Sequence, residues 1–258
     1  LTVNTGGRVR IAGVLADGTR VSQSSRLLYF ADCDGGHCYV PFFVPLYRKT
    51  GYVSGLFWIN SDTLEIYNDL PMRWENPGKG PDGFTGLLDM WGAAYAPTLA
   101  LSEEYLFSAY LDEEVCAYHN AGEAWGCEFW PEGVPVNVTG SRLTIARGDR
   151  PVRIREDGET WYEYGGVNPN MVTLSFAART GIFRGNFTLY YDYYDERERF
   201  QHKTVRVPYV GVLIQDPETG RLDLGYGHCL FPSKDPELRA YRIKPSFPVE
   251  LGGPGIDP

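Results

Sequence analysis

A short unit in which two glycines bracket alternating residues occurs three times in this chain, and it constrains the fold more than any other feature. The three copies span residues 7–13, 51–57 and 181–187. Successive side chains of a strand point to opposite faces of a sheet, so the alternation places apolar side chains on one face. Glycine within a strand marks a bend or the close approach of another backbone. The repeated unit therefore predicts a fold built from antiparallel hairpins.

Turn signals between strand-like runs support the same prediction. Asp17-Gly18 and Asp157-Gly158 each lie between two such runs, which is typical of a tight hairpin. We expect the longest hairpin to join residues 182–194 to residues 203–214. With 30 Gly and 18 Pro among 258 residues, few stretches can hold a long helix. The predicted fold class is all-β, an antiparallel sandwich or barrel organised as one large or two smaller β subdomains.

The sequence predicts two β subdomains, at residues 1–112 and 113–231, and an extended Pro-rich tail at residues 232–258. The apolar residues of the tail are too numerous for a solvated linker. We expect the tail to pack on a neighbouring subunit as an added edge strand, because sheets tolerate proline at their edges. The alternatives are that the tail folds back on its own domain or that it is disordered. The residues expected to make the assembly contact are Tyr241, Ile243, Phe247, Val249 and Leu251.

Four of the five cysteines lie in two local pairs. Cys33 and Cys38 lie between two strand-like runs, and Cys116 and Cys127 flank a short polar loop. We expect each pair to form a disulfide, which implies an oxidising compartment. Buried free thiols and a metal site are the alternatives. The residues available to a metal site are Cys33, His37, Cys38, His228 and Cys229, but their spacing matches no familiar zinc site.

The charge and hydropathy of the chain exclude some classes of function. A net charge of -9 argues against nucleic-acid binding as the main role, because contacts with phosphates need a basic surface. The chain has no run of about 18 apolar residues, so we predict no membrane span. Leu1, rather than Met, begins a strand-like run, so we expect the chain to start after a processing site or partway into a longer protein.

Patterns that carry catalysis or bind a cofactor are absent from the sequence. No serine has a Gly-x-Ser-x-Gly environment, and there is no phosphate loop or dinucleotide fingerprint. Glu103-Glu104 and Glu113-Glu114 are candidate acids for glycoside hydrolysis. Adjacent residues of a strand point in different directions, however, which favours surface charge. We therefore predict no catalytic residue, no cofactor and no bound metal.

The charged tip of the longest hairpin presents a calcium alternative, since hard cations prefer clustered carboxylates. Basic residues interleave with these acids, so we expect a solvated, charge-paired hairpin tip instead. The acids of the tip are Asp192, Asp195, Glu196 and Glu198, and its bases are Arg197, Arg199 and Lys203.

The tryptophans and a cluster of tyrosines present the alternative of sugar binding. Exposed rings on a sheet can form a stacking platform, whereas rings in sheets are more often core residues or cross-strand pairs. The candidates for such a platform are Trp58, Trp74, Trp91, Trp125, Trp130, Trp161, Tyr190, Tyr191, Tyr193 and Tyr194.

The order of several motifs resembles a repeated β-module of large secreted bacterial proteins, especially those of Verrucomicrobia and related phyla. The resemblance covers residues 3–231, with gaps at 68–83, 113–135 and 147–170. It implies a tandem all-β protein that is extracellular or lies on the cell surface, and it brings no catalytic residue. The motifs that carry it are residues 5–13, 15–19, 22–24, 44–47, Lys49, Gly51, Gly55, 180–187, 210–215 and 225–227.

Our first hypothesis for function is a structural subunit without enzymatic activity, extracellular or at the cell surface. It would assemble with itself or with other subunits into a filament or array, through exchange of a strand or the tail. The second hypothesis is a carbohydrate-binding or adhesive β-module, and the third is a glycoside-active enzyme. A row of exposed, coplanar aromatic rings would favour the second hypothesis, and converging carboxylates in a cleft would favour the third.

Overall fold

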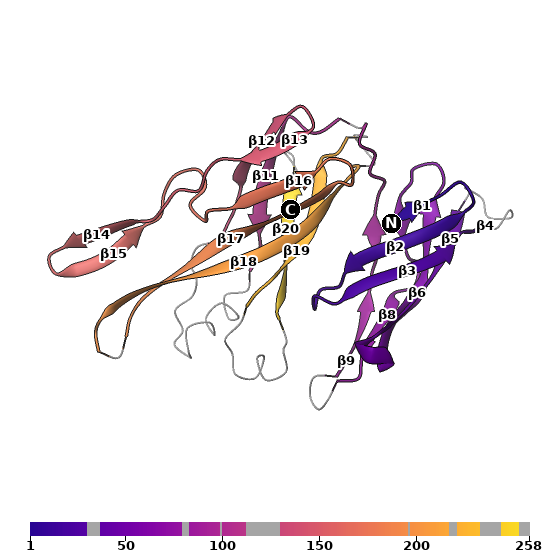
Figure 1. The fold of residues 1–258 in the computed structure, drawn as a ribbon, viewed down its shortest axis with the longest axis horizontal. Coiled ribbons are helices and arrows are strands. Elements are labelled where there is room, and N and C mark those ends of the chain that lie inside the picture. The colour runs from indigo at the N-terminus through magenta and orange to yellow at the C-terminus, as the bar shows by residue number, and fades with distance from the viewer. Residues whose placement is uncertain are drawn as a thin grey trace. The chain divides into compact units, whose positions relative to one another are not determined.

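The computed structural model describes residues 1–29, 37–78, 83–98, 100–111, 130–195, 197–216, 221–232 and 244–252. Within these ranges the structure is almost wholly antiparallel β-strand, which confirms the predicted fold class (Figure 1). The chain divides into two compact units, unit 1 at Leu1–Ala94 and unit 2 at Tyr95–Pro258. All of the strand ladders in the described ranges lie inside one unit or the other.

Unit 1 contains a three-stranded sheet, β1-β2-β3, and a seven-stranded sheet with the order β10-β7-β6-β5-β4. In the larger sheet β8 also pairs with β6, and β9 pairs with β8. The elements of unit 1 are β1 (Thr2–Val3), β2 (Arg8–Val14), β3 (Arg20–Arg26), β4 (Leu28–Tyr29), β5 (His37–Leu46), the 3-10 turn η1 (Tyr47–Lys49), β6 (Gly51–Asn60), β7 (Ile66–Tyr67), β8 (Met72–Asn76), β9 (Phe84–Leu88) and β10 (Trp91–Gly92).

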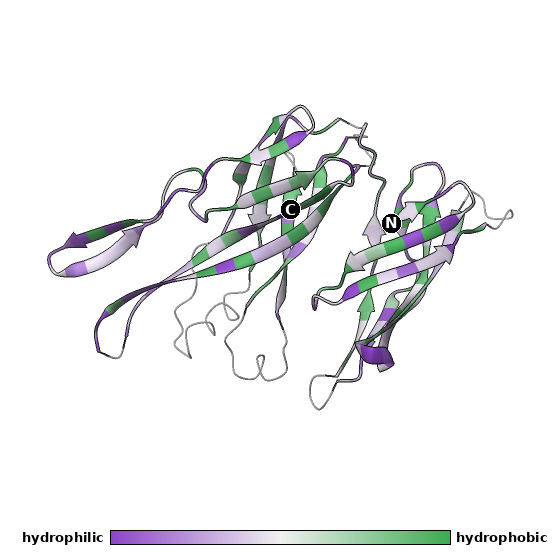
Figure 2. Ribbon diagram, in the orientation of Figure 1, coloured by the Kyte–Doolittle hydropathy of each residue, from purple (hydrophilic) through white to green (hydrophobic). Residues whose placement is uncertain are grey.

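The core of unit 1 lies between its two sheets. Val9 of β2 and Val21 of β3 pack against alternate, inward-facing residues of the larger sheet, among them Val40 and Phe57. Figure 2 shows hydrophobic and hydrophilic residues alternating over part of β2, and the exposure of side chains alternates along β3. Side chains at every second position of these strands therefore point inward and form this core.

A side-chain amide joins the edges of the two sheets of unit 1. The backbone N–H of Phe43 donates to Oε1 of Gln23 over 2.8 Å, and the Gln23 amide nitrogen reaches the Pro41 carbonyl at 3.5 Å. The hydroxyl of Ser25 donates to the same carbonyl over 2.8 Å. The Gln23 amide therefore makes the hydrogen bonds that a peptide group of a neighbouring strand would make, and it covers this part of the β5 edge.

Unit 2 contains an eight-stranded sheet with the order β13-β12-β11-β20-β19-β18-β17-β16, and a separate hairpin, β14-β15. Figure 1 shows that hairpin and the far end of β17-β18 projecting beyond the larger sheet. The strands of unit 2 are β11 (Glu104–Ala109), β12 (Val134–Thr139), β13 (Arg142–Ile145), β14 (Val152–Glu156), β15 (Glu159–Glu163), β16 (Thr173–Ala177), β17 (Ile182–Tyr194), β18 (Phe200–Ile214), β19 (Leu224–Leu230) and β20 (Ser246–Gly252).

The larger sheet of unit 2 is nearly closed, because its end strands β13 and β16 contact each other. Asn168, which is fully buried, closes the seam with its side-chain amide. Its nitrogen donates to the carbonyls of Ala146 (2.8 Å) and Val172 (2.9 Å), and its oxygen accepts from the N–H of Val172 (2.7 Å). The fully buried rings of Tyr105 and Phe187 lie in the core that the sheet encloses.

The predicted subdomain boundary at residue 112 is wrong. Unit 1 ends at Ala94, and β11 lies in unit 2 between β12 and β20. The segment 71–83 is rich in proline and glycine, yet it contains β8 within unit 1. Local composition could not assign β11 to unit 2, because its partner β20 lies far away in the sequence.

The predicted assembly contact of the tail is also wrong for the part of it that the structure describes. Phe247, Val249 and Leu251 lie in β20, an interior strand that pairs with both β11 and β19. Val249 and Leu251 are fully buried in the core of unit 2. The alternative prediction, that the tail folds back on its own domain, holds for residues 246–252. Tyr241 and Ile243 lie outside the described residues.

The proline in β20 is accommodated because of its position in the ladders. Pro248 lies one residue before Val249, where the pairing with β11 ends. Its carbonyl still accepts a hydrogen bond from the N–H of Tyr110 at 3.1 Å. At the end of a ladder the missing N–H of proline costs little, so an interior strand tolerates it there.

The structure contains no disulfide in the described ranges. Cys38 is a free thiol on β5, and Cys229 is a free, fully buried thiol in the core of unit 2. Cys33, Cys116 and Cys127 lie outside the described residues. The structure therefore gives no support to a Cys33–Cys38 bond, and the Cys116–Cys127 bond stays a prediction.

Helical structure in the described ranges consists of the single turn η1, and none of it has the length and apolarity that a membrane-crossing helix needs.

Candidate functional site

The larger sheet of unit 1 presents a second face, opposite the core, that is unusually rich in apolar and aromatic side chains. Strand alternation and the cross-strand register assign these side chains to one face. We call this surface the outer face. Its apolar members are Leu28, Tyr39, Pro41, Phe43, Tyr52, Leu56, Trp58, Tyr67, Leu87 and Trp91.

Four aromatic residues of the outer face form a single row across four strands. Tyr39 of β5 lies opposite Trp58 of β6, Trp58 lies opposite Tyr67 of β7, and Tyr67 lies opposite Trp91 of β10. Three strand spacings of about 4.8 Å place the ends of the row about 14 Å apart. We call these four residues the aromatic row.

The aromatic row is buried at its centre and open toward its ends. Trp58 is 6% exposed and meets the ring of Tyr67 edge-on, at 64° between the ring planes. Trp91 is 50% exposed, and Tyr39 and Tyr67 are half-buried. Neighbouring rings therefore hold Trp58 in place, while the flanking rings offer surface to a ligand.

Polar groups of the segment after β7 fix the row. The indole N–H of Trp58 donates to the Asp69 carboxylate over 3.1 Å. The side chain of Asn68 donates to the carbonyls of Leu70 and Leu88 and accepts from the N–H of Met90, which holds the segment that leads into β10. These contacts preorganise the position of Trp91, the most exposed ring of the row.

Carboxylates lie beside the row, and one of its phenols has a raised pKa. Burial is the main cause of the raised pKa of Tyr67, and the negative charges of Glu65 and Asp69 add to it. Asp69 is exposed and already holds the Trp58 indole, so its carboxylate is within reach of both ring and solvent. The row thus combines apolar rings with acceptors for hydroxyl groups.

A second pair of rings extends the outer face along β5 and β6. Phe43, which is 57% exposed, stacks on Tyr52 at 5.7 Å between ring centroids and 26° between planes. The Tyr52 hydroxyl bonds Glu75, which raises its pKa, and Glu75 also pairs with Arg73 at 3.1 Å. This part of the outer face repeats the combination of exposed rings and charged hydrogen-bonding groups.

This combination suits a ligand that has both apolar faces and hydroxyl edges. The π-face of an aromatic ring is electronegative and attracts the electropositive C–H groups of a saccharide ring. Carboxylates and guanidinium groups beside the rings bond hydroxyls and set their orientation. The outer face therefore has the chemistry to bind an oligosaccharide.

The structure brings together only two of the predicted platform residues, Trp58 and Trp91. Trp74 points into the core of unit 1, where it packs edge-on against Phe84 and its indole donates to the Tyr47 hydroxyl over 3.0 Å. The other predicted platform residues belong to unit 2. Those that are described are Trp130, Trp161, Tyr190, Tyr191, Tyr193 and Tyr194, and Trp125 lies outside the described residues.

Sequence reasoning missed Tyr39, Tyr67 and Phe43. These residues lie on β5 and β7, and no local pattern groups them with the tryptophans. The signal that finds them is register: once the β5-β6 hairpin is aligned, Tyr39 and Trp58 share a face. The β6-β7 and β7-β10 ladders then place Tyr67 and Trp91 on that face as well.

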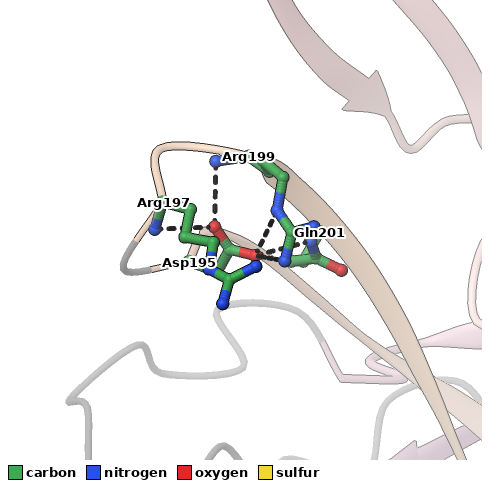
Figure 3. Close-up of polar contacts among 4 residues, drawn as sticks. All are labelled: Asp195, Arg197, Arg199 and Gln201. Atoms are coloured by element: carbon green, nitrogen blue, oxygen red, sulfur yellow. Dashed lines mark hydrogen bonds and ion pairs between the residues drawn. The ribbon is translucent and has the colours of Figure 1, made fainter.

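The tip of the β17-β18 hairpin is charge-paired, as expected (Figure 3). The Asp195 carboxylate accepts hydrogen bonds from the backbone N–H groups of Arg197 and Arg199, both at 3.0 Å. It also accepts from the Arg199 guanidinium (2.7 and 3.0 Å) and the Gln201 amide (3.1 Å). These donors, with the Arg199 side chain foremost, lower the pKa of Asp195 to about 2. Its oxygens are committed to the turn, which disfavours the calcium alternative.

A second cluster at this hairpin joins it to β15. His202 and Asp192 lie directly opposite each other, with 2.6 Å between Nδ1 and the carboxylate. The Tyr164 hydroxyl donates to the other oxygen of Asp192, and the Tyr162 ring stacks on His202 at 3.9 Å. Burial, followed by Asp192, raises the pKa of Tyr164. These contacts fasten the β14-β15 hairpin to β17-β18, and we assign the cluster a structural role.

The candidate metal and catalytic residues do not converge in the described structure. Cys38 belongs to unit 1, whereas Cys229 is sealed in the core of unit 2, where burial raises the pKa of its thiol to about 12. Glu103 and Glu104 are exposed, as a surface role requires, and Glu113 and Glu114 lie outside the described residues.

Comparison with known proteins gives no further guide to function: no family model, no curated protein and no solved structure matches the chain.

Proposed function

We propose that this protein is a non-catalytic adhesive module, extracellular or at the cell surface, that binds carbohydrate on the outer face of unit 1. This is the second of the three hypotheses that the sequence suggests. It now precedes the structural-subunit hypothesis, because the tail strand expected to link subunits is an interior strand of unit 2.

The aromatic row is the observation that carries the proposal. It is continuous over four strands, its end residue Trp91 is half exposed, and acceptors such as Asp69 lie beside it. An exposed apolar surface of this kind marks a place of interaction in a soluble domain. The polar groups within it favour a hydroxyl-rich ligand over a purely apolar one.

Two properties of the sequence support the proposed location. The motif order resembles secreted bacterial β-modules, and the net charge of -9 suits a soluble extracellular surface. Within the described residues, one edge of strand β9 has no strand beside it, and this favours a second candidate function, a structural role in a surface assembly.

Binding to defined polysaccharides tests the proposal. The full chain is incubated with insoluble cellulose, chitin and xylan, and the soluble hexasaccharide of any polysaccharide that retains it is titrated calorimetrically. We expect Trp91→Ala and Tyr39→Ala each to weaken binding about tenfold, because each removes an aromatic contact and the apolar area it buries. Tryptophan emission should shift to shorter wavelength on binding, since a sugar would cover Trp91.

Tyr226→Ala is the matched control, because Tyr226 is an aromatic residue of unit 2 that is 41% exposed. It should bind as tightly as the natural chain. Retention of the chain by none of the three polysaccharides, or equal losses in the Tyr226 and Trp91 variants, would contradict the proposal.

A further inference from the structure

Strand β9 leaves one edge of the larger sheet of unit 1 open. β9 pairs with β8 over its whole length, from Leu88 opposite Met72 to Phe84 opposite Asn76. In the described ranges its other edge has no strand beside it. Backbone N–H and C=O groups on such an edge are a template for another strand, and proteins normally block them with charge, proline, short length or a cover.

Several other described edges of both units carry such protection. β1, β4 and β10 have two residues each, and β14-β15 is charged along both strands. The edge of β5 beyond β4 contains Pro41 and Pro45, and the Gln23 amide covers part of it. β13 and β16 lie against each other. β9 has none of these protections: its five residues, Phe-Thr-Gly-Leu-Leu, include no charge and no proline, and no described strand lies on its open side.

We propose that β9 pairs with β9 of a second copy of this chain, antiparallel and about a two-fold axis at Gly86. This register sets Phe84 against the partner's Leu88, and Thr85 against the partner's Leu87. An interface on a two-fold axis must be complementary to itself, and here each facing pair is uncharged. A chain with a net charge of -9 repels its own copies at most surfaces, so an uncharged edge is the place where two copies can meet.

On both faces of the sheet, β9 carries apolar side chains that can take part in this contact. On the core side, Phe84 packs edge-on against Trp74 at 4.7 Å and Leu88 packs against the core of unit 1. On the outer face Leu87 is 71% exposed. Pairing would cover the open flank of Phe84 and Leu88 and bury part of Leu87, so apolar burial adds to the backbone hydrogen bonds.

The geometry has a consequence for binding at the outer face. Antiparallel pairing in one continuous sheet places the two-fold axis perpendicular to that sheet. The outer faces of both copies then lie on the same side, and two aromatic rows are presented together. A polymer that contacts both rows gains avidity without any new contact.

The oligomeric state of the full chain tests the proposal, and it does so whether or not the protein binds sugar. Light scattering over a concentration series should show a dimer that dissociates on dilution, because a five-residue edge gives a small interface. Leu87→Lys and Thr85→Lys place a charge on the edge and should each give a monomer. Circular dichroism and the melting temperature verify that both variants remain folded.

Leu56→Lys is the matched control. Leu56 lies on the same outer face and is 46% exposed, but it belongs to the interior strand β6. This variant should remain a dimer. A natural chain that is monomeric at every concentration overturns the proposal, and so does a dimer that survives Leu87→Lys. A dimer lost equally in the Leu56 variant would place the interface on the outer face and overturn the edge contact.

Discussion

The turn after β5 stores backbone strain at single residues. Tyr47, Arg48 and Lys49 have φ values of 50°, 60° and 74°, so three successive residues with side chains occupy the left-handed region. Each such residue costs about 1–2 kcal/mol relative to an ordinary conformation. The Tyr47 hydroxyl donates to Asp17 over 2.5 Å and accepts from the Trp74 indole. These contacts hold the turn, and burial followed by Asp17 raises the pKa of Tyr47 to about 12.

Replacing the middle residue of this turn with glycine should stabilise the protein. Arg48 is exposed, and Arg48→Gly removes the steric cost of its left-handed conformation. We expect the free energy of unfolding in urea to rise by about 1 kcal/mol, after allowance for the greater freedom of glycine in the unfolded chain. Arg48→Ala removes the same charge but keeps the Cβ, so it should change stability by less than about 0.5 kcal/mol. Equal effects of the two substitutions would show that the backbone is not the cause.

His228 of β19 should make the protein sensitive to mild acid. Burial lowers the pKa of His228 from its ordinary value of 6.5, so the folded state binds its proton less readily than the unfolded state. Stability is therefore greatest above about pH 6.5 and declines as the pH falls below it, by at most about 1.4 kcal/mol for each unit of the pKa difference. Urea midpoints at pH 7 and pH 5 measure this decline, and His228→Gln should reduce it. An unchanged decline in that variant would assign the effect to other groups.

At the level of elements, the long β17-β18 hairpin carries much of the core of unit 2. Phe187 is fully buried against Phe107 and Tyr209, with ring centroids 6.4 Å away in both cases. Phe187→Ala should lower the free energy of unfolding by about 3–5 kcal/mol, because it leaves a cavity in a packed interior. Ile182, on the same strand, is 42% exposed, and Ile182→Ala should cost much less. Similar losses in both variants would mean that this hairpin is not packed as described.

Local pattern and turn chemistry predict the hairpins well. Asp17-Gly18 and Asp157-Gly158 form the expected turns, and the longest hairpin has the expected partners. Apolar character within it is less reliable for single residues: Ile182 and Val212 are both apolar, yet they lie opposite each other on the exposed face. The apolar character of a residue does not determine which face of the sheet its side chain occupies. The register of the strand does.

Pairings between distant segments could not be predicted from local pattern. β20 pairs with β11 from Leu106 opposite Gly252 to Ala109 opposite Val249, across more than half of the chain. The same limit applies to the aromatic row, since Trp91 joins Trp58 only through β7. The sequence supplied the residue types of the candidate site, but their arrangement depends on ladders that no turn motif specifies.

The whole molecule should behave as two independently folding units divided at residue 94. Each unit has its own core, and no ladder in the described ranges joins them. We expect fragments 1–94 and 95–258 each to give a β-type circular dichroism spectrum and a cooperative unfolding transition. Fragment 113–258, cut at the boundary that composition suggested, should not. It lacks β11, which leaves β12 and β20 unpaired on one side and removes the fully buried Tyr105 and Phe107 from the core. Cooperative unfolding of 113–258 at the melting temperature of 95–258 would show that β11 is dispensable and that the division at residue 94 is not the one the core requires.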